Sequence, residues 1–428
     1  MGQLRTRVSA WLARRYLSRV RKKGFDLSRL GMFPDSALMP LRRNGLDPVP
    51  ELARLREREP ISKLDIPFGV NVWLVSGYEE TKAVLSDATR FSNDFNNLVG
   101  EGGANADANP GGLGFADPPV HTRLRKLLTP EFTMRRLSRL KPGIAEIIDQ
   151  RLDAIAAASA HGPVDLVQEF ALPIPSLVIC ELLGVPYEDR DAFQHLSVAR
   201  FDLFSGAEAS FGAISESLEY LLGVVRKQRE NPGDGLLGMI IKEHGDEVDD
   251  RELAGLADGV LTGGFETTAS MLALGALVLL QDQETFKRIG GAADDDPVVH
   301  GFVEEALRHL TVVQAAFPRF AREDLEIGGV RIGQGDVVVC SLSGANRDPE
   351  FGPALEDFDA FRSPTKHVAF GHGVHRCIGA ELARMELRAA YPALVRRFPD
   401  LRLAVPAHEL EFRKVSVVYG VESLPVLV

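Results

Sequence analysis

The chain has 428 residues, of which 45% are apolar and 25% charged, as is ordinary for a globular protein with a large core. Its net charge of −11 argues against general nucleic-acid binding. Its three cysteines include no C-x-x-C pair and cannot form a disulfide framework, so we expect a reducing, cytoplasmic setting. No signal peptide is expected, because the apolar run that it would need is interrupted by Arg5, Arg7, Arg14 and Arg15.

Residues 1–45 are interpreted as a basic, amphipathic N-terminal extension. The first 23 residues carry eight lysines and arginines and no acidic residue, with apolar residues at roughly helical spacing. One hypothesis is a solvated basic helix. The other is a helix that contacts a membrane surface weakly or docks a partner.

Residues 46–428 are interpreted as a single domain. Its first part predicts two short strands and then a helix over residues 69–87. The Gly- and Asn-rich segment over residues 93–119 has no periodicity, and its length is typical of a binding loop or of disorder.

Helical patterns dominate residues 121–309, and β-rich runs separated by glycines follow Phe317. The longest apolar stretch, residues 269–280, is too short to span a membrane and predicts a buried central helix. A last helix is expected just after Cys377, followed by strand-like alternation to the C-terminus. The domain is therefore expected to be mainly α, with a β-rich minority.

Residues 366–379, "KHVAFGHGVHRCIG", hold three of the ten histidines and one of the three cysteines. His372, His375 and Cys377 could ligate zinc, but neither a fourth ligand nor a paired spacing is near. A Cys–His nucleophile is the second alternative. The third is a haem-iron ligand: Cys377 lies at the start of a predicted helix, whose dipole stabilises a thiolate, and glycines suit a loop wrapped around a large flat group. Because C-x-x-C-H is absent, such a haem would be bound non-covalently.

Four motifs in order resemble the cytochrome P450 family. The segment Phe370-x-x-Gly373-x-x-x-Cys377-x-Gly379 is similar to its haem-binding signature, and Glu305-x-x-Arg308 to its E-x-x-R. "FDAFR", with Arg362, and "GGFETT", with Thr267, are similar to two further family segments. The resemblance covers most of the chain beyond Leu46. It implies the P450 fold of the soluble bacterial type, a large helical domain with a long central helix and a smaller β-rich region.

The resemblance implies haem b as cofactor, with Cys377 as the iron ligand. The other cofactor-binding residues that it implies are Gly263, Phe370, Gly371 and Gly379 beside the haem, and His121, Arg125, Arg319 and His375 at its propionates. Arginine suits a carboxylate because its fork matches the two oxygens. Taken singly, each of these basic residues would more often be a surface charge.

Two pairs of polar residues on expected helices each have a purely structural and a functional interpretation. Thr267 could simply bond back to the preceding turn, whereas the resemblance makes Glu266 and Thr267 the acid–alcohol pair that delivers protons to bound dioxygen. Glu305 and Arg308 share one helix face and could form a solvated salt bridge. The resemblance instead implies a buried structural network with Arg362.

The implied function is monooxygenation of a small apolar organic substrate, namely a steroid, terpenoid, fatty acid, polyketide or aromatic compound. Electrons would come from NAD(P)H through a ferredoxin reductase and a ferredoxin, which would dock near Arg376 on a protein expected to be a monomer. Phe201, Phe204, Phe265 and Phe317 are candidates for the substrate pocket, or plain core. A peroxide-driven peroxygenase and a haem-thiolate sensor or carrier remain alternatives. His367 and His372 are interpreted as structural loop residues, and Cys180 and Cys340 as buried and inert.

Overall fold

The computed structural model of the chain describes residues 35–66, 71–94, 113–185, 207–293, 295–363 and 365–428, with the backbone alone for residues 207–217. The predicted N-terminal helix, most of the predicted binding loop and the candidates Phe201 and Phe204 lie outside the described residues.

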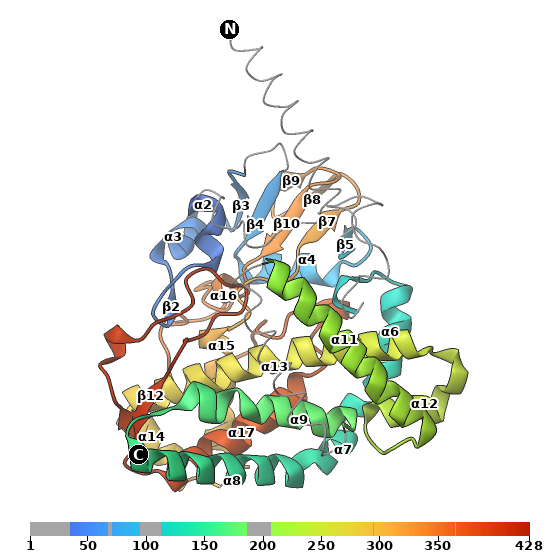
Figure 1. Ribbon diagram of the computed structural model, residues 1–428. Coiled ribbons are helices and arrows are strands. Elements are labelled where there is room, and N and C mark those ends of the chain that lie inside the picture. Colours follow the sequence, from blue (N-terminus) through green and yellow to red (C-terminus); the bar gives the residue numbers. More distant parts are fainter. Residues whose placement is uncertain (1–34, 67–70, 95–112, 186–206, 294, 364) are drawn as a thin grey trace.

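The described residues form a large helical part, in the lower half of Figure 1, and a smaller β-rich part that holds the main sheet, in the upper half. The helices are α2 (Asp35–Leu38), α3 (Pro50–Arg58), α4 (Tyr78–Ser86), α6 (Val120–Leu128), α7 (Met134–Leu137), α8 (Lys141–Ala158), α9 (Pro173–Leu183), α11 (Ala207–Glu230), α12 (Leu236–His244), α13 (Asp250–Gln281), α14 (Gln283–Gly291), α15 (Pro297–Leu310), α16 (Leu342–Ala345) and α17 (Ala380–Arg397). The strands are β1 (Arg43–Asn44), β2 (Asp47–Pro48), β3 (Ile61–Leu64), β4 (Val72–Val75), β5 (Phe91–Ser92), β6 (Val164–Asp165), β7 (Arg319–Ala321), β8 (Leu325–Ile327), β9 (Val330–Ile332), β10 (Val337–Cys340), β11 (Arg402–Leu403) and β12 (Pro425–Leu427).

The main sheet joins distant parts of the chain in the order β3-β4-β10-β7-β5. Strands β10 and β4 are parallel, with Val337 opposite Val72, and the other pairs are antiparallel. The prediction of two strands over residues 69–87 was wrong for the part described here, which contains β4 alone before α4. The apolar run "VWLV" is one continuous strand, and its antiparallel partner β3 precedes it in the chain.

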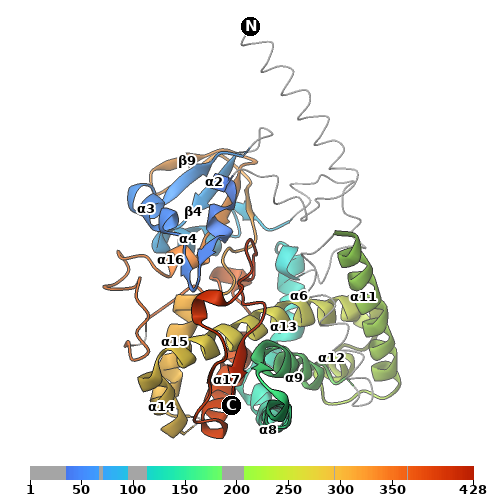
Figure 2. The same cartoon turned by 60° about the vertical axis from the view of Figure 1, so that its left-hand side comes forward.

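The predicted central helix is α13, which has 32 residues and crosses the helical part (Figures 1 and 2). Asp249 caps its N-terminus by accepting a hydrogen bond from the backbone N–H of Glu252. By length and composition, α13 is the one helix in the described ranges that could cross a membrane, but its most apolar window is 78% buried within the protein. It packs against α9, α11 and α17 and is therefore a core helix.

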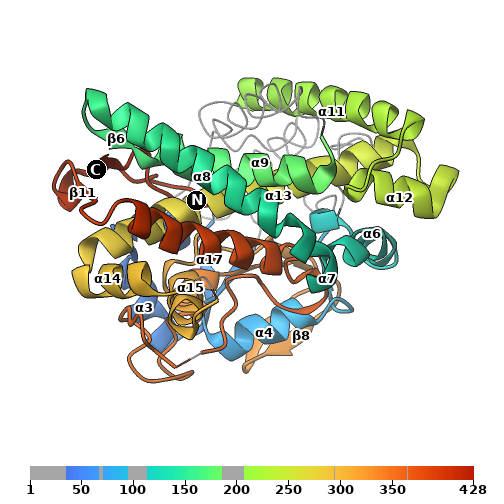
Figure 3. The ribbon, with the colours of Figure 1, turned by 90° about the horizontal axis from the view of Figure 1, so that it is seen from below.

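The last helix, α17, lies under α13 and also packs against α8, α14 and α15 (Figure 3). Its Tyr391 hydroxyl donates a hydrogen bond to the Met271 carbonyl at 2.5 Å. A Cβ atom at Gly275 would lie 2.0 Å from that hydroxyl oxygen, so a glycine is needed where the two helices meet. This contact fixes α17, and with it the segment that precedes α17 in the chain.

The segment over residues 43–48 is joined to the main body by a half-buried arginine. Arg43 donates hydrogen bonds to the Gln314 side chain and to the carbonyls of Leu46 and Thr311, and its guanidinium lies 4.9 Å from the centre of the Tyr419 ring. Arg43, at the end of the expected extension, thus packs against residues of the expected domain.

Candidate functional site

The loop before α17 carries Cys377 and is shaped by two glycines in the left-handed region. Gly371 has φ +68° and Gly373 has φ +71°. A Cβ atom at Gly373 would lie 2.3 Å from the Leu85 carbonyl oxygen, so only glycine allows the loop to approach α4 this closely. The Cys377 N–H donates to the Phe370 carbonyl at 2.9 Å, which closes the loop.

Cys377 lies three residues before the first residue of α17, as predicted. The residue is solvent-exposed, yet protein atoms crowd its thiol, and this burial raises the pKa. A hydrogen bond from the Gly379 N–H and the charges of Arg125, Arg376 and Arg384 act in the opposite direction and stabilise the thiolate. The other two cysteines, Cys180 in α9 and Cys340 in β10, are buried, and burial raises the pKa of Cys340 to about 12.

Four basic side chains from three segments gather near this loop. The rings of His121 and His375 lie 4.1 Å apart, and electrostatic interactions link His375 to Arg125 and Arg319. Burial, and then the neighbouring positive charges, lower the pKa of His375 to about 3 and also lower that of His121. At neutral pH the two imidazoles are therefore uncharged hydrogen-bond donors, while the two arginines carry the charge.

This cluster has the properties of an anion site. His121 is 2% exposed, and its Nε2 has no hydrogen-bond partner among the described residues. Arg319 is 5% exposed and donates to the Phe317 carbonyl. Buried donors and charges without enough acceptors favour a bound anion.

Asp117 is the nearby acidic group, and the sequence did not indicate it. Its carboxylate accepts hydrogen bonds from the Ser92 hydroxyl, the Asn93 N–H and the Arg322 guanidinium. Its charge also raises the pKa of His375 and Arg319, against the larger lowering effects. The partners come from distant segments, so no local spacing indicates this role.

The polar positions of α13 lie in its middle, where Gly263 is exposed and Glu266 and Thr267 are half-buried. The Thr267 hydroxyl donates to the Gly263 carbonyl at 2.7 Å, which is the local back-bond that the sequence left open. Phe265, a candidate for the substrate pocket, is buried in the apolar core.

Glu266 has a partner that the sequence did not indicate. Its carboxylate lies 2.7 Å from the guanidinium of Arg413, which also donates to the Val418 carbonyl. Burial raises the pKa of Glu266, and the charge and hydrogen bond of Arg413 partly offset that rise. Arg413 lies 147 residues away in the chain, on a C-terminal hairpin whose Tyr419 N–H donates to the Val312 carbonyl.

The network of Glu305, Arg308 and Arg362 is present. Arg308 is 1% exposed, and its Nε and Nη2 both lie 2.7 Å from the Glu305 carboxylate oxygens. The Nε of Arg362 donates to the same carboxylate at 3.2 Å. Arg308 also donates to the Asn346 carbonyl, and the Asn346 side chain accepts a hydrogen bond from the Val368 N–H. The network thus reaches the Cys377 loop through Asn346.

Phe317 is 51% exposed, and its ring lies 4.6 Å from that of Phe115, a residue that the sequence did not single out. Phe115 belongs to the short 3-10 helix Leu113–Phe115, which packs against α13. Aromatic surface is therefore held between the central helix and the segment that leads to Arg319.

Comparison with known proteins shows the family to which the chain belongs. The family model for cytochrome P450 matches residues 59–231 and 224–400. The chain belongs to the cytochrome P450 family. This P450 is 41% identical to "Cytochrome P450 FAS1" of Rhodococcoides fascians, over 90% of this chain and 96% of that protein. It is 40% identical to "Cytochrome P450 monooxygenase PikC" of Streptomyces venezuelae, over 89% and 91% of the two chains.

Solved structures are equally similar to this P450. OxyC, described as implicated in an oxidative C–C coupling reaction during vancomycin biosynthesis, has a TM-score of 0.81 and 37% identity, and the match covers 92% of this chain and 97% of that one. OxyB in complex with the X-domain from teicoplanin biosynthesis has a TM-score of 0.81 and 40% identity, over 91% and 99% of the chains. The protein is therefore a P450 monooxygenase, and the predicted fold is confirmed.

The residues of this P450 fit the haem that the family carries. The cluster of His121, Arg125, Arg319 and His375 suits two propionates, and the orphaned His121 Nε2 is a buried donor for such a group. Cys377 offers a single sulfur with an N–H group beside it. Within the described ranges, no three His, Cys, Asp or Glu side chains gather as a zinc site would require.

Proposed function

We propose that this P450 inserts one atom of dioxygen into a small apolar organic substrate and releases the other as water, using haem b with Cys377 as its iron ligand. The supporting observation is the convergence on one loop of a single cysteine, its Gly379 N–H and the cationic cluster. When bound, the haem supplies dioxygen activation, which donation from a thiolate promotes.

The residues of this chain perform three tasks in that reaction. Arg125 and Arg319 bind the propionates by charge, while His121 and His375 donate hydrogen bonds as neutral imidazoles. Gly379 holds the sulfur as a hydrogen-bond acceptor.

The third task is proton supply, because forming water from one oxygen atom consumes two protons. Glu266 has a raised pKa and is therefore a better proton donor near neutral pH than an ordinary carboxyl group. The Thr267 hydroxyl, one residue later, can accept a proton on one side and donate on the other. Its bond to the Gly263 carbonyl holds this hydroxyl on the exposed side of α13.

Electrons are proposed to come from a ferredoxin with an acidic docking face. Lys366 and Arg376 line a surface cleft of about 190 Å³ beside the Cys377 loop, and these charges would attract such a partner. The substrate is proposed to be an aromatic natural product, because Phe115 and Phe317 offer aromatic surface and the similar protein OxyC is described as implicated in a reaction during vancomycin biosynthesis.

The test of the proposal is spectroscopic and uses the purified holoenzyme. Reduction under carbon monoxide should give the Soret band of thiolate ligation, and Cys377→His should replace it by the band of histidine ligation. A wild-type spectrum of the thiol or histidine type would refute the proposal.

A second measurement separates monooxygenation from the alternatives. With electron donor and substrate, Thr267→Ala should consume reducing equivalents with about tenfold less product, because general acid–base groups contribute about 10²–10⁴-fold to proton transfer. Thr267→Ser, which keeps the hydroxyl, should remain coupled. Unchanged coupling in Thr267→Ala would exclude Thr267 from proton delivery. Product formation with peroxide but not with the electron donor would favour a peroxygenase, and no turnover in the wild type with either would favour a sensor or carrier.

A further inference from the structure

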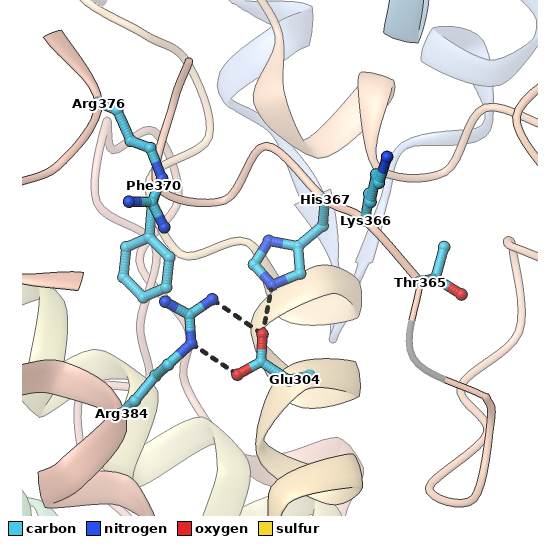
Figure 4. Close-up of a pocket in the computed structure, with 7 residues that line it drawn as sticks. All are labelled: Glu304, Thr365, Lys366, His367, Phe370, Arg376 and Arg384. Atoms are coloured by element: carbon cyan, nitrogen blue, oxygen red, sulfur yellow. Dashed lines mark hydrogen bonds and ion pairs between the residues drawn. The ribbon is translucent and has the colours of Figure 1, made fainter. Parts of the chain in front are cut away.

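Glu304 is one of the residues that line the cleft beside the Cys377 loop, and it directly precedes Glu305 of the buried network in the chain (Figure 4). Two nitrogens of Arg384 donate to its two carboxylate oxygens at 2.6 and 2.8 Å. His367 Nε2 lies 3.2 Å from the same carboxylate, and Arg388 Nη2 lies 3.4 Å away. Three basic side chains thus converge on one carboxylate.

The imidazole of His367 has a defined orientation. Its Nδ1 accepts a hydrogen bond from the Ala369 N–H at 3.2 Å, so its Nε2 carries the proton that is donated to Glu304. The His367 side chain is 4% exposed. This histidine, a structural loop residue in the sequence analysis, links α15 to the loop.

The Glu304 carboxylate stays charged in this setting. Burial would raise its pKa, but the hydrogen bonds of Arg384 and His367 and the charge of Arg384 outweigh burial and hold the pKa well below its ordinary value of 4.5. A bidentate Arg–carboxylate pair with little exposed surface is the strong form of such a contact. The side chain of Arg384 is 11% exposed and that of Glu304 is 25% exposed.

Two paths lead from Glu304 to Cys377. The first runs through His367 to Phe370, whose carbonyl accepts the Cys377 N–H. The second runs through Arg384, whose guanidinium lies 4.7 Å from the centre of the Phe370 ring and whose charge interacts with the Cys377 sulfur. Glu304 therefore fixes both the backbone that holds the sulfur and the cation that acts on it.

We propose that Glu304 is a positioning residue for the thiolate. By neutralising Arg384 and holding the loop through His367, Glu304 sets the reduction potential of the bound haem. The inference rests on the proposed haem-thiolate function. Reduction adds one negative charge to the haem, so a neighbouring carboxylate disfavours it and an uncompensated arginine favours it.

A matched control exists on the other side of Arg384. Glu381 lies 2.9 Å from Arg384 Nη1, and its side chain is 39% exposed. Glu381→Gln removes the same unit of charge as Glu304→Gln, but from a more solvated carboxylate that has no contact with His367 among the described residues. Screening makes exposed pairs weak.

The experiment is a redox titration of the holoenzymes with visible absorbance. Glu304→Gln should raise the midpoint potential, giving about a threefold higher ratio of ferrous to ferric protein at a fixed potential. Glu381→Gln should leave the ratio nearly unchanged, and Glu304→Asp, which keeps the charge, should lie between. Equal ratios in the two glutamine variants, or a lower potential in Glu304→Gln, would overturn the inference.

A second variant covers the case in which Glu304→Gln does not fold. His367→Ala removes one path only, and its ferrous carbon monoxide complex should convert from the thiolate-type to the thiol-type band several times faster than the wild type. An unchanged rate would also overturn the inference. A wild-type complex without the thiolate-type band would instead refute the proposed function, before any variant is compared.

Discussion

Arg308→Ala is the sharpest test of how the loop is supported, because Arg308 is 1% exposed and satisfies several buried groups at once. Its loss would leave the Glu305 carboxylate without its bidentate partner, and breaking a buried pair costs about 3–5 kcal/mol. The carbonyls of Asn346 and Leu355 would also lose a donor, at about 1 kcal/mol each. We expect a loss of about 5 kcal/mol, a large part of the roughly 5–15 kcal/mol of a typical protein.

The measurement is urea unfolding followed by far-ultraviolet circular dichroism, with Arg362→Ala as the control. The side chain of Arg362 is 14% exposed, and it makes one longer bond to Glu305, so its removal should cost about 1–2 kcal/mol. Arg308→Lys keeps the charge but loses the fork and should fall between the two. A loss of less than about 1 kcal/mol in Arg308→Ala would refute the reasoning.

The pH dependence of folding stability is a second test of the same network. Burial would raise the pKa of Glu305, but Arg308 outweighs it, so the folded-state pKa lies below the ordinary value of 4.5. A lowered carboxyl pKa stabilises the fold fully above pH 4.5, and this contribution is lost as the pH falls through the folded-state value. The stability difference between wild type and Arg308→Ala should therefore shrink in acid.

Three further variants test the site. Gly373→Ala should abolish haem loading, because its Cβ would lie 2.3 Å from the Leu85 carbonyl oxygen. Gly371→Ala is the control: its Cβ would meet open space, and the substitution should cost only about 1–3 kcal/mol of backbone strain. Equal haem content in the two variants would contradict this prediction. Arg319→Ala should release haem to a scavenger globin about tenfold faster than wild type, as loss of one charge-assisted bond predicts, and an unchanged rate would exclude Arg319 from the propionate site. Arg413→Ala should raise the pKa of Glu266 and move the alkaline limit of coupled turnover to higher pH, while Arg413→Lys should move it less; an identical pH profile would exclude Glu266 as the proton donor.

Local patterns in the sequence predicted the parts of the structure that local patterns determine. The apolar run over residues 269–280 is buried in α13, because a helix that is apolar on all faces belongs inside a protein. The spacing of Glu305 and Arg308 placed both on one face, and the structure pairs them. The position of Cys377 before a helix is likewise a property of neighbouring residues.

Contacts between distant segments could not be predicted in this way. Arg413 reaches Glu266 because the C-terminal hairpin pairs with residues near Val312, and no periodicity records that pairing. The contacts of Asp117 and Phe115 could not be predicted either, because each is made with a segment that is distant in the chain. His367 lies in the loop, but its link to Glu304 depends on the approach of α15.

The two adjacent carboxylates of α15 support the same loop in different ways. Glu305 acts through Arg308 and Asn346, whose side chain holds the Val368 N–H at 2.7 Å. Glu304 acts on the next residues, through His367 and the ring of Phe370. Because the Glu305 path is deeply buried and the Glu304 path opens onto the cleft, loss of the first should appear mainly in the free energy of unfolding. Loss of the second should appear mainly in the reduction potential, so the two sets of variants should separate stability from electron affinity on one helix.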